Sequence, residues 1–233
     1  MHKKINTIIS FYKFIEIKDT NSLRDLIFNY LKRLNILGTV LIANEGINVN
    51  LCGGSNEIKL AKDFITKQLK LELIHHNESD IHSQAFSKLK VKVKKEIIKV
   101  GLEINESDID ENKHLNPEEW DDLLNNKPIV LDTRNRFEYL LGTFENAKSL
   151  DLVNFSSFKE KVIANKNLDK KQNIAIFCTG GIRCEKASVI LEDLGFKNVF
   201  QLKGGILNYL NYNKNVNSKW KGDCFVFDDR ITL

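Results

Sequence analysis

The feature that most constrains the fold is a short segment in which an apolar strand passes through a cysteine into a helix. The apolar run Ile174–Phe177 leads directly into Cys178, and a loop with two glycines follows. Apolar residues then recur at helical spacing from Ala187 to Leu194, and Gly195 follows where helices commonly end. The segment therefore predicts a buried strand, a tight loop and a helix, the repeating unit of a parallel α/β sheet.

Cys178 lies at the point of this segment where an anion is best stabilised. Unpaired backbone N–H groups and the positive end of the helix dipole meet at a helix N-terminus, and Arg183 adds a full positive charge. We expect these groups to lower the pKa of Cys178 from about 8.5 toward the reactive range of about 3.5–7.5. The alternative, an ordinary buried thiol, is common among cysteines. The glycine loop and the nearby arginine favour a nucleophile.

The residues around this cysteine receive matching roles. We assign catalysis to Cys178 and Arg183, and the active-site loop to Thr179, Gly180, Gly181, Ile182 and Cys184. The backbone N–H groups of residues 179–183 would form a concave site for the sulfur anion. Cys184, in the first helical turn, could resolve an oxidised Cys178 as a disulfide. The alternative is a small packed thiol that points away from the loop, and the sequence leaves both open.

A second group of polar residues follows the neighbouring apolar strand at 128–131. Asp132 ends this strand, with Arg134 and Glu138 close behind it. Because the carboxyl ends of parallel strands meet at one edge of a sheet, these residues are candidates to support the cysteine loop. Arg183 would either face the sulfur or pair with such a supporting carboxylate. The alternative for Asp132 and Arg134 is a structural ion pair.

The first hundred residues predict a compact α+β unit. Strands are expected at 5–14, 39–43, 47–51 and 71–74, and helices at 21–34 and 55–65, the first capped by Asn21 or Ser22. The order β-α-β-β-α-β is that of the ferredoxin-like (acylphosphatase-like) fold. Residues 101–115 are polar and without periodicity, which is typical of a linker.

The second half alternates strands with helices. Helices are expected after Asn116, over 155–163 and through Tyr209, the second with Phe155, Phe158, Val162 and Ile163 on its buried face. A short strand is expected at 199–202 and a last strand over 220–228. The predicted organisation is an α/β protein in which a ferredoxin-like α+β domain (1–100) and the linker precede a parallel-sheet α/β domain (116–215), and the tail 216–233 follows.

A stretch near the end of the first domain alternates lysines with apolar residues. Lys88, Lys90, Lys92 and Lys94 are separated by Leu89, Val91 and Val93. This pattern predicts a strand with one apolar and one basic face. The basic face either guards a solvated edge strand against aggregation or contacts nucleic-acid phosphates. Lysines that contact phosphate position a nucleic acid without reading its sequence.

Composition excludes several classes of protein. The 233 residues are 42% hydrophobic and 28% charged with a net charge of +4, which is typical of a globular protein. No run approaches 18 apolar residues and no signal peptide is evident, so we expect no membrane segment and a cytoplasmic location. The four cysteines are dispersed without a Cys-x-x-Cys pair, which argues against a usual zinc site and a disulfide framework.

The second half resembles a rhodanese domain. The resemblance rests on the segments 131–134, 138–139, 142–147, the Cys178 loop and 202–206, and covers residues 116–213. The loop from Cys178 to Arg183 spans six positions, whereas cysteine phosphatases of the same superfamily use seven to cradle a phosphate. Phe177 also stands where those phosphatases have a histidine. The resemblance therefore implies sulfur carried on Cys178 as a persulfide, and makes phosphatase activity unexpected.

A narrower resemblance spans nearly the whole chain. The run 178–188, the segment 44–48 and the tail 220–228 are similar to the bacterial tRNA uridine(34) hydroxylase family. This resemblance implies oxygen-dependent formation of 5-hydroxyuridine at the tRNA wobble position, with molecular oxygen as co-substrate and the tRNA anticodon loop as partner. It also allows a small-molecule or protein sulfur donor. No cofactor is identifiable, because the five histidines lack facial-triad spacing and no GxGxxG motif is present.

Two alternatives to this function stay open. The first is a general sulfurtransferase that passes sulfur through a Cys178 persulfide, although the N-terminal domain would then have no obvious use. The second is a non-catalytic binding module, which is disfavoured because such rhodanese relatives commonly lack the loop cysteine.

Overall fold

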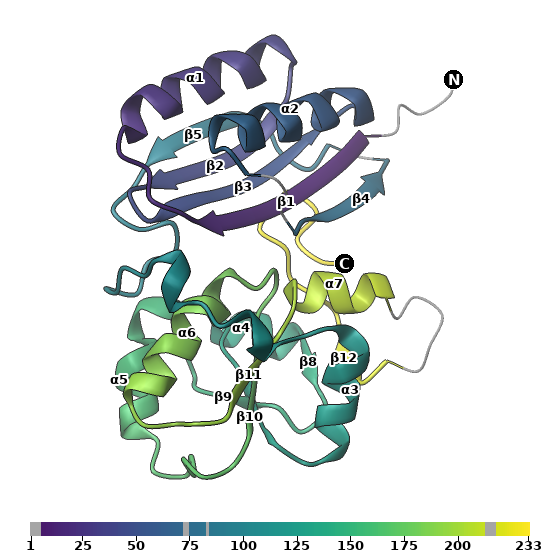
Figure 1. Ribbon diagram of the computed structural model, residues 1–233. Coiled ribbons are helices and arrows are strands. Elements are labelled where there is room, and N and C mark those ends of the chain that lie inside the picture. Colours follow the sequence, from purple (N-terminus) through teal and green to yellow (C-terminus); the bar gives the residue numbers. More distant parts are fainter. Residues whose placement is uncertain (1–5, 72–74, 83, 213–217) are drawn as a thin grey trace. The chain divides into compact units, whose positions relative to one another are not determined.

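The computed structural model describes residues 6–71, 75–82, 84–212 and 218–233, and the chain divides into two compact units (Figure 1). The first unit comprises residues up to Ile97 together with Phe227–Arg230. The second comprises Ile98–Val226 and Ile231–Leu233. None of the described helices combines the length and the apolar composition that crossing a bilayer requires.

The first unit is a five-stranded sheet with two helices on one face (Figure 1). Its elements are β1 (Asn6–Phe14), α1 (Thr20–Arg33), β2 (Leu37–Ala43), β3 (Gly46–Gly53), α2 (Ser55–Gln68), β4 (Asn77–Ile81) and β5 (Leu89–Val93). The strand order β4-β1-β3-β2-β5 holds the ferredoxin-like arrangement in its first four strands. The predicted fold of this half is confirmed, and β5 extends it by pairing parallel to β2.

Alternation along the strands explains the core of this unit. Ile9 and Phe11 of β1 and Val40 and Ile42 of β2 are buried in one cluster with apolar residues of both helices, such as Ile27. The side chains between them point to the opposite face, since successive side chains of a strand alternate. The two faces of the sheet are thus chemically distinct, and only one of them carries helices.

Two boundaries in this unit differ from the predictions. The N-cap of α1 is Asp19, whose carboxylate accepts a hydrogen bond from the Ser22 backbone at 3.0 Å, so neither Asn21 nor Ser22 is the cap. The fourth strand lies at 77–81 rather than at 71–74, of which residues 72–74 lie outside the described residues. Only Ile81 of this edge strand is buried, so the strand shows little of the apolar pattern that sequence reasoning relies on.

The second unit is built on a parallel sheet of order β6-β11-β10-β7-β9, which confirms the predicted α/β architecture. Its strands are β6 (His114–Leu115), β7 (Ile129–Asp132), β9 (Lys148–Ser149), β10 (Ile174–Phe177) and β11 (Val199–Leu202), and β8 (Gly142–Phe144) pairs with β12 (Trp220–Gly222) apart from it. The helices are α3 (Pro117–Asn125), α4 (Arg136–Leu141), α5 (Phe158–Ala164), α6 (Ile182–Asp193) and α7 (Gly205–Tyr212). Short 3₁₀ turns lie at Glu106–Asp108, Glu111–Lys113 and Phe155–Ser157.

Strand β10 is the centre of this sheet and is buried along its whole length. Ile174 and Ile176 pack into the cluster that includes α5 and α6, while Ala175 and Phe177 pack into a second cluster on the other face. The Phe177 ring lies 4.9 Å from the ring of Phe144, centroid to centroid, in an edge-to-face arrangement. A continuous apolar run suits a strand that is covered on both faces. Because β10 is held in this way, the position of Cys178, which follows Phe177, is well defined.

Three further predictions for the second half need correction. Ile163, expected on the buried face of its helix, is 61% exposed, because that helix begins as a 3₁₀ turn and continues as α5 only from Phe158. The tail strand ends at Gly222 instead of extending to 228, and residues 227–230 belong to the first unit. The stretch 101–115, predicted as a linker, contains two 3₁₀ turns and the edge strand β6. Main-chain pairing with β11 holds β6 in place, so its side chains need not follow a periodic apolar pattern.

Candidate active site

The cysteine loop lies where sequence reasoning expected it, between β10 and α6. Gly181 precedes α6 with φ = 99°, a left-handed conformation that favours glycine. The start of α7 holds the loop from the other side, since the backbone N–H groups of Ile206 and Leu207 donate to the carbonyls of Cys178 and Thr179 at 3.0 and 3.1 Å.

Gly205 makes this contact between α7 and the loop feasible. It has φ = +67°, and a Cβ atom at this position would lie 2.5 Å from the carbonyl oxygen of Cys178. Gly205 falls within the segment 202–206 that carries the rhodanese resemblance, but no role at the site was predicted for it. A side chain is usually tolerated at the start of a helix, so a glycine there is a sequence signal for a close backbone contact such as this one.

The sulfur of Cys178 is surrounded by donors and has no exposed surface. The backbone N–H of Gly181 donates to it at 3.1 Å, and the N–H groups of Arg183 and Cys184 also face it. Burial raises the pKa of Cys178, but a hydrogen bond from the Cys184 thiol, the charge of Arg183 and these N–H groups outweigh burial and lower the pKa to about 6. That value lies in the range expected from the sequence.

Cys184 faces Cys178, so the alternative of a thiol that points away from the loop is wrong. Burial, the hydrogen bond to Cys178 and the negative charge on that sulfur raise the pKa of Cys184 well above its ordinary value. Cys184 therefore stays protonated and donates its S–H to the Cys178 thiolate. The hydroxyl of Thr133 lies 3.8 Å from the Cys184 sulfur. Both cysteines are free thiols.

Arg183 pairs with a carboxylate, and that carboxylate is Glu138 of α4. Two hydrogen bonds of 2.7 and 2.9 Å join the guanidinium to the carboxylate, and the Thr179 hydroxyl donates to Glu138 at 3.2 Å while accepting from Arg183 at 3.1 Å. Glu138 is fully buried. Burial raises the pKa of Glu138, but the bonds to Arg183 outweigh it and hold the pKa below its usual value. The three side chains tie the loop to α4.

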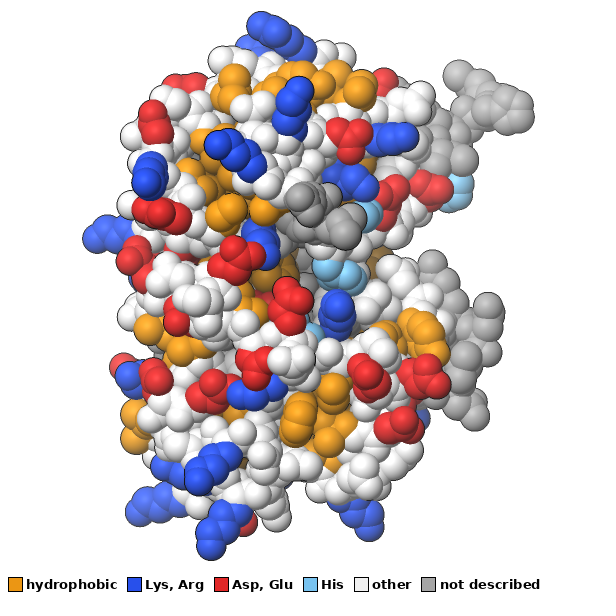
Figure 2. All heavy atoms as spheres, viewed as in Figure 1, with side chains coloured by type: hydrophobic (Ala, Val, Ile, Leu, Met, Phe, Trp, Pro, Cys, Tyr) orange, Lys and Arg blue, Asp and Glu red, His pale blue; other side chains and the backbone are white. Residues whose placement is uncertain are grey.

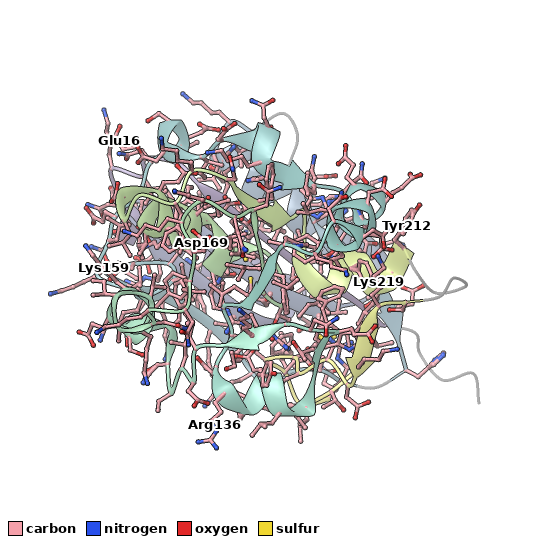
Figure 3. All side chains as sticks on the ribbon, turned by 90° about the horizontal axis from the view of Figure 1, so that it is seen from below. Glu16, Arg136, Lys159, Asp169, Tyr212 and Lys219 are labelled. Atoms are coloured by element: carbon pink, nitrogen blue, oxygen red, sulfur yellow. The ribbon has the colours of Figure 1, made fainter. Side chains whose placement is uncertain are left out.

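Asp132 and Arg134 form a separate buried ion pair. Arg134 donates to the Asp132 carboxylate at 2.9 and 2.6 Å and to the Gly142 carbonyl at 2.6 Å, and the Thr143 hydroxyl donates to Asp132 at 3.0 Å. These bonds join the end of β7 to β8, which matches the structural alternative for this pair. Arg136 lies only two residues beyond Arg134, but its side chain is 66% exposed and points outward (Figure 3).

The outer side of the loop lies at Gly180 and Ile182, which are half-buried while Cys178 is buried. A Cβ atom at Gly180 would meet nothing within 4 Å. The loop is therefore packed on the protein side and open at Gly180.

Of the four predicted lysines, Lys90 and Lys92 lie in β5 of the first unit, and Lys88 and Lys94 flank that strand. Lys88, Lys90, Lys92 and Lys94 are all exposed. Over the visible side of the molecule, by contrast, basic side chains are interspersed with acidic ones (Figure 2). Within the described parts of the chain, no three His, Cys, Asp or Glu side chains converge as a metal site would require.

Comparison with known proteins places both units in described families. Residues 6–97 match the model of the UPF0176 acylphosphatase like domain, and residues 116–212 match that of the rhodanese-like domain. The tRNA uridine(34) hydroxylase of Pelagibacter ubique is 46% identical over 97% of this chain and 74% of its own length. The proteins of the same name from Legionella pneumophila and Wolbachia pipientis are each 40% identical over 97% of this chain, and 89% and 82% of their own lengths.

Proposed function

The chain belongs to the tRNA uridine(34) hydroxylase family, and we propose that it hydroxylates uridine 34, the wobble position of tRNA, to 5-hydroxyuridine in an oxygen-dependent reaction. The similarity extends over 97% of the chain and includes both units, so it supports the function of the whole protein and not of a rhodanese domain alone. This similarity over both units is the observation that carries the proposal, and the buried Cys178 sulfur, with a pKa lowered to about 6, supplies a thiolate at neutral pH.

We assign the chemistry to Cys178 as a persulfide-forming nucleophile. The N–H of Gly181 and the thiol of Cys184 stabilise negative charge on its sulfur. Arg183 contributes charge, and its two bonds to Glu138 hold the loop in the conformation that presents these donors. In this assignment Glu138 and Thr179 are positioning residues, while Asp132 and Arg134 stabilise the neighbouring strand end.

The proposed partner is the anticodon loop of tRNA, and the proposed compartment is therefore the cytoplasm. Single-stranded loops are where proteins reach unstacked bases. The proposed phosphate contacts are Lys90 and Lys92 of β5 with Lys88 and Lys94, which flank that strand, since all four are exposed and alternate with apolar residues. A small-molecule or protein sulfur donor would be needed if Cys178 works as a persulfide.

Complementation tests this function. Cells that lack the gene would receive the wild-type chain, Cys178→Ala, Cys184→Ala or, as the matched control, Cys52→Ala, a buried cysteine of the first unit. Mass spectrometry of tRNA nucleosides should find 5-hydroxyuridine derivatives restored by wild type and by Cys52→Ala, and absent with Cys178→Ala. Unchanged 5-hydroxyuridine in the deletion strain, or its restoration by Cys178→Ala at equal protein level, would refute the proposal.

The second candidate function is a general sulfurtransferase, which the low pKa of Cys178 also fits. Thiosulfate:cyanide sulfur transfer by the purified protein separates the two. Brisk turnover together with unchanged 5-hydroxyuridine in the deletion strain would favour the sulfurtransferase.

A further inference from the structure

The sheet of the first unit has one face without helices, and its chemistry is unusual for a structural surface. Leu89 and Val91 of β5 pack against the core beneath α1 and α2, so alternation turns Lys90 and Lys92 to the opposite face. We call this opposite side the helix-free face (Figure 1). The lysines of β5 therefore share a surface with the side chains of β1, β3 and β2 that point away from the helices.

The strand register aligns these side chains in two rows that each cross four strands. The rows are Ser10–Asn50–Thr39–Lys90 and Tyr12–Asn48–Leu41–Lys92, in the strand order β1-β3-β2-β5. Neighbouring strands are about 4.8 Å apart, so each row runs roughly 14 Å across the sheet. The two rows form a single band, with a lysine at the same end of each.

Seven of the eight side chains in this band are polar or basic. The six residues of β1, β2 and β3 are half-buried and the two lysines are exposed. The Asn50 amide donates to the Asn48 side chain at 3.3 Å, which holds the two amides side by side. The Tyr12 ring lies edge-to-face with the ring of Phe14, centroid to centroid 6.1 Å.

The band is bounded by apolar packing at both ends. On one side Ile8 and Cys52 are buried in a cluster with Ala85 and Phe86. On the other side Phe14 is buried, with 1% of its surface exposed. On β1 and β3 the polar side chains of the band are thus flanked by apolar ones, whereas a solvated sheet face would be polar throughout.

The residue types match the parts of a single-stranded nucleic acid. Amides of Asn present a donor and an acceptor together, as base edges do. A tyrosine ring offers a surface on which a base stacks, and lysines contact phosphates. An acidic protein partner would use the lysines but would have no need of the ring and the paired amides.

We propose that the helix-free face is a platform for single-stranded RNA, on which Tyr12, Asn48 and Asn50 meet bases and Lys90 and Lys92 meet phosphates. This inference deepens the proposed function, on which it rests for the identity of the RNA as a tRNA loop. It adds residues that contact bases to the proposed RNA contacts, which so far were all lysines.

The binding test uses the full chain carrying Cys178→Ala, which separates binding from turnover. The probe is a fluorescein-labelled 17-nucleotide anticodon stem–loop with uridine at the wobble position, and binding is followed by fluorescence anisotropy. Lys90→Ala with Lys92→Ala should weaken binding about tenfold or more and lower the salt dependence, d log K/d log [salt], by about 1.4 for two lost phosphate contacts.

The matched control is Lys59→Ala with Lys67→Ala, which removes the same charge from exposed positions of α2, on the other face of the sheet. This pair should change the affinity less than about twofold. Equal losses from the two pairs would mean that the RNA responds only to net charge, and would overturn the proposal.

Tyr12 provides the second arm of the test. Tyr12→Ala should weaken binding roughly 5- to 150-fold, the range for loss of one base–aromatic stack, while Tyr12→Phe keeps the ring and should bind like wild type. Unaltered binding by Tyr12→Ala, or equal losses in the two variants, would overturn the stacking role. Circular dichroism melts would establish that each variant is folded, and the lysine pairs keep the test decisive if Tyr12→Ala does not fold.

Photocrosslinking checks the site directly and separates this inference from the proposed function. RNA with 4-thiouridine in the loop should crosslink to peptides of β1 or β3, whereas crosslinks confined to α1 and α2, or equal affinity for a duplex RNA of the same length, would overturn the platform. None of these readouts requires hydroxylation. Loss of 5-hydroxyuridine in the deletion strain with no effect of Lys90, Lys92 or Tyr12 on binding would refute the platform alone.

Discussion

Arg183 and Glu138 are joined by two hydrogen bonds of 2.7 and 2.9 Å in the interior of the second unit, although 45 residues separate them in the chain. The arginine follows β10 and the glutamate belongs to α4, so the pair fixes the cysteine loop against a neighbouring helix. Burial opposes ionisation of Arg183, but its bonds to Glu138 prevail and raise its pKa. Arg183 thus supplies positive charge near the Cys178 sulfur, and its pairing with Glu138 holds the loop in place.

Glu138→Gln tests how much this buried ion pair contributes to stability. Removing one charge of a buried pair leaves the other uncompensated, and we expect the free energy of unfolding to fall by about 3 kcal/mol in urea titrations. Because the pKa of Glu138 is lowered in the folded state, its contribution is present above about pH 4.3 and is lost as the pH falls through the folded-state pKa. The stability difference from wild type should therefore shrink below about pH 4.

The control for this prediction is Glu118→Gln, at an exposed position of α3. It makes the same chemical change and should alter stability by less than about 0.5 kcal/mol. A Glu138→Gln protein as stable as this control would contradict the role of the pair.

The pKa of Cys178 can be read from the pH dependence of its alkylation. The thiolate is the reactive form, so the rate of carbamidomethylation of Cys178 by iodoacetamide, followed by peptide mass spectrometry, should rise with pH and reach half its maximum near pH 6. Cys184→Ala removes a hydrogen bond to the thiolate and should move the midpoint to higher pH. Burial raises the pKa of Cys224 to about 12, so that residue is an internal control that should stay unmodified. A midpoint near pH 8.5 in the wild type would contradict the stabilised thiolate.

The contact between Cys178 and Cys184 predicts a disulfide on oxidation. A hydroperoxide oxidises the Cys178 thiolate to a sulfenic acid, and condensation with the Cys184 thiol then forms the disulfide and releases water. Non-reducing peptide mapping after treatment with one equivalent of hydrogen peroxide should find the 178–184 link, reversed by dithiothreitol. In Cys184→Ser the sulfenic acid has no resolving partner, so one equivalent should leave sulfenic acid at Cys178, which dimedone traps, and a second equivalent of hydrogen peroxide should oxidise it to sulfinic acid. A wild type in which one equivalent leaves trappable sulfenic acid at Cys178 and no 178–184 link would rule out resolution by Cys184.

Gly205→Ala tests the contact between α7 and the loop. A Cβ atom at Gly205 would lie 2.5 Å from the Cys178 carbonyl, in a backbone with φ = +67°. We expect a loss of at least about 2 kcal/mol in stability, since the alanine adds this overlap to the backbone strain, together with a higher pKa of Cys178 because the loop is displaced.

Gly101→Ala is the matched control, because Gly101 has φ = +79° but nothing within 4 Å of its Cβ position. It should cost only the backbone strain, about 1 kcal/mol, and leave the alkylation midpoint of Cys178 unchanged. Equal effects of the two substitutions would show that the loop contact is unimportant.

Local signals were sufficient to locate the cysteine loop and most elements of both sheets. The apolar run before Cys178, the glycines after it and the periodic helix are all encoded within about twenty residues, and the dipole argument for a low pKa needs only their order. The fourth strand was predicted at the wrong position because its own residues carry little local signal. An edge strand is held mainly by main-chain pairing with β1, so polar side chains give little sign of it.

The sequence by itself determined that a reactive cysteine follows a buried strand, since strand, loop and helix are neighbours along the chain. Only the tertiary structure decided that Arg183 binds Glu138 and not Asp132, that Cys184 faces the sulfur, and that residues 227–230 join the first unit. The choice of Glu138 depends on which side chains distant in the sequence become buried together, and residues 227–230 join the first unit through a main-chain hydrogen bond from Asp229 to Ala85. In the sequence, Asp132 and Glu138 are equally plausible partners for Arg183. Only in the folded chain is one of these carboxylates buried against the guanidinium, where an unpaired charge would be costly.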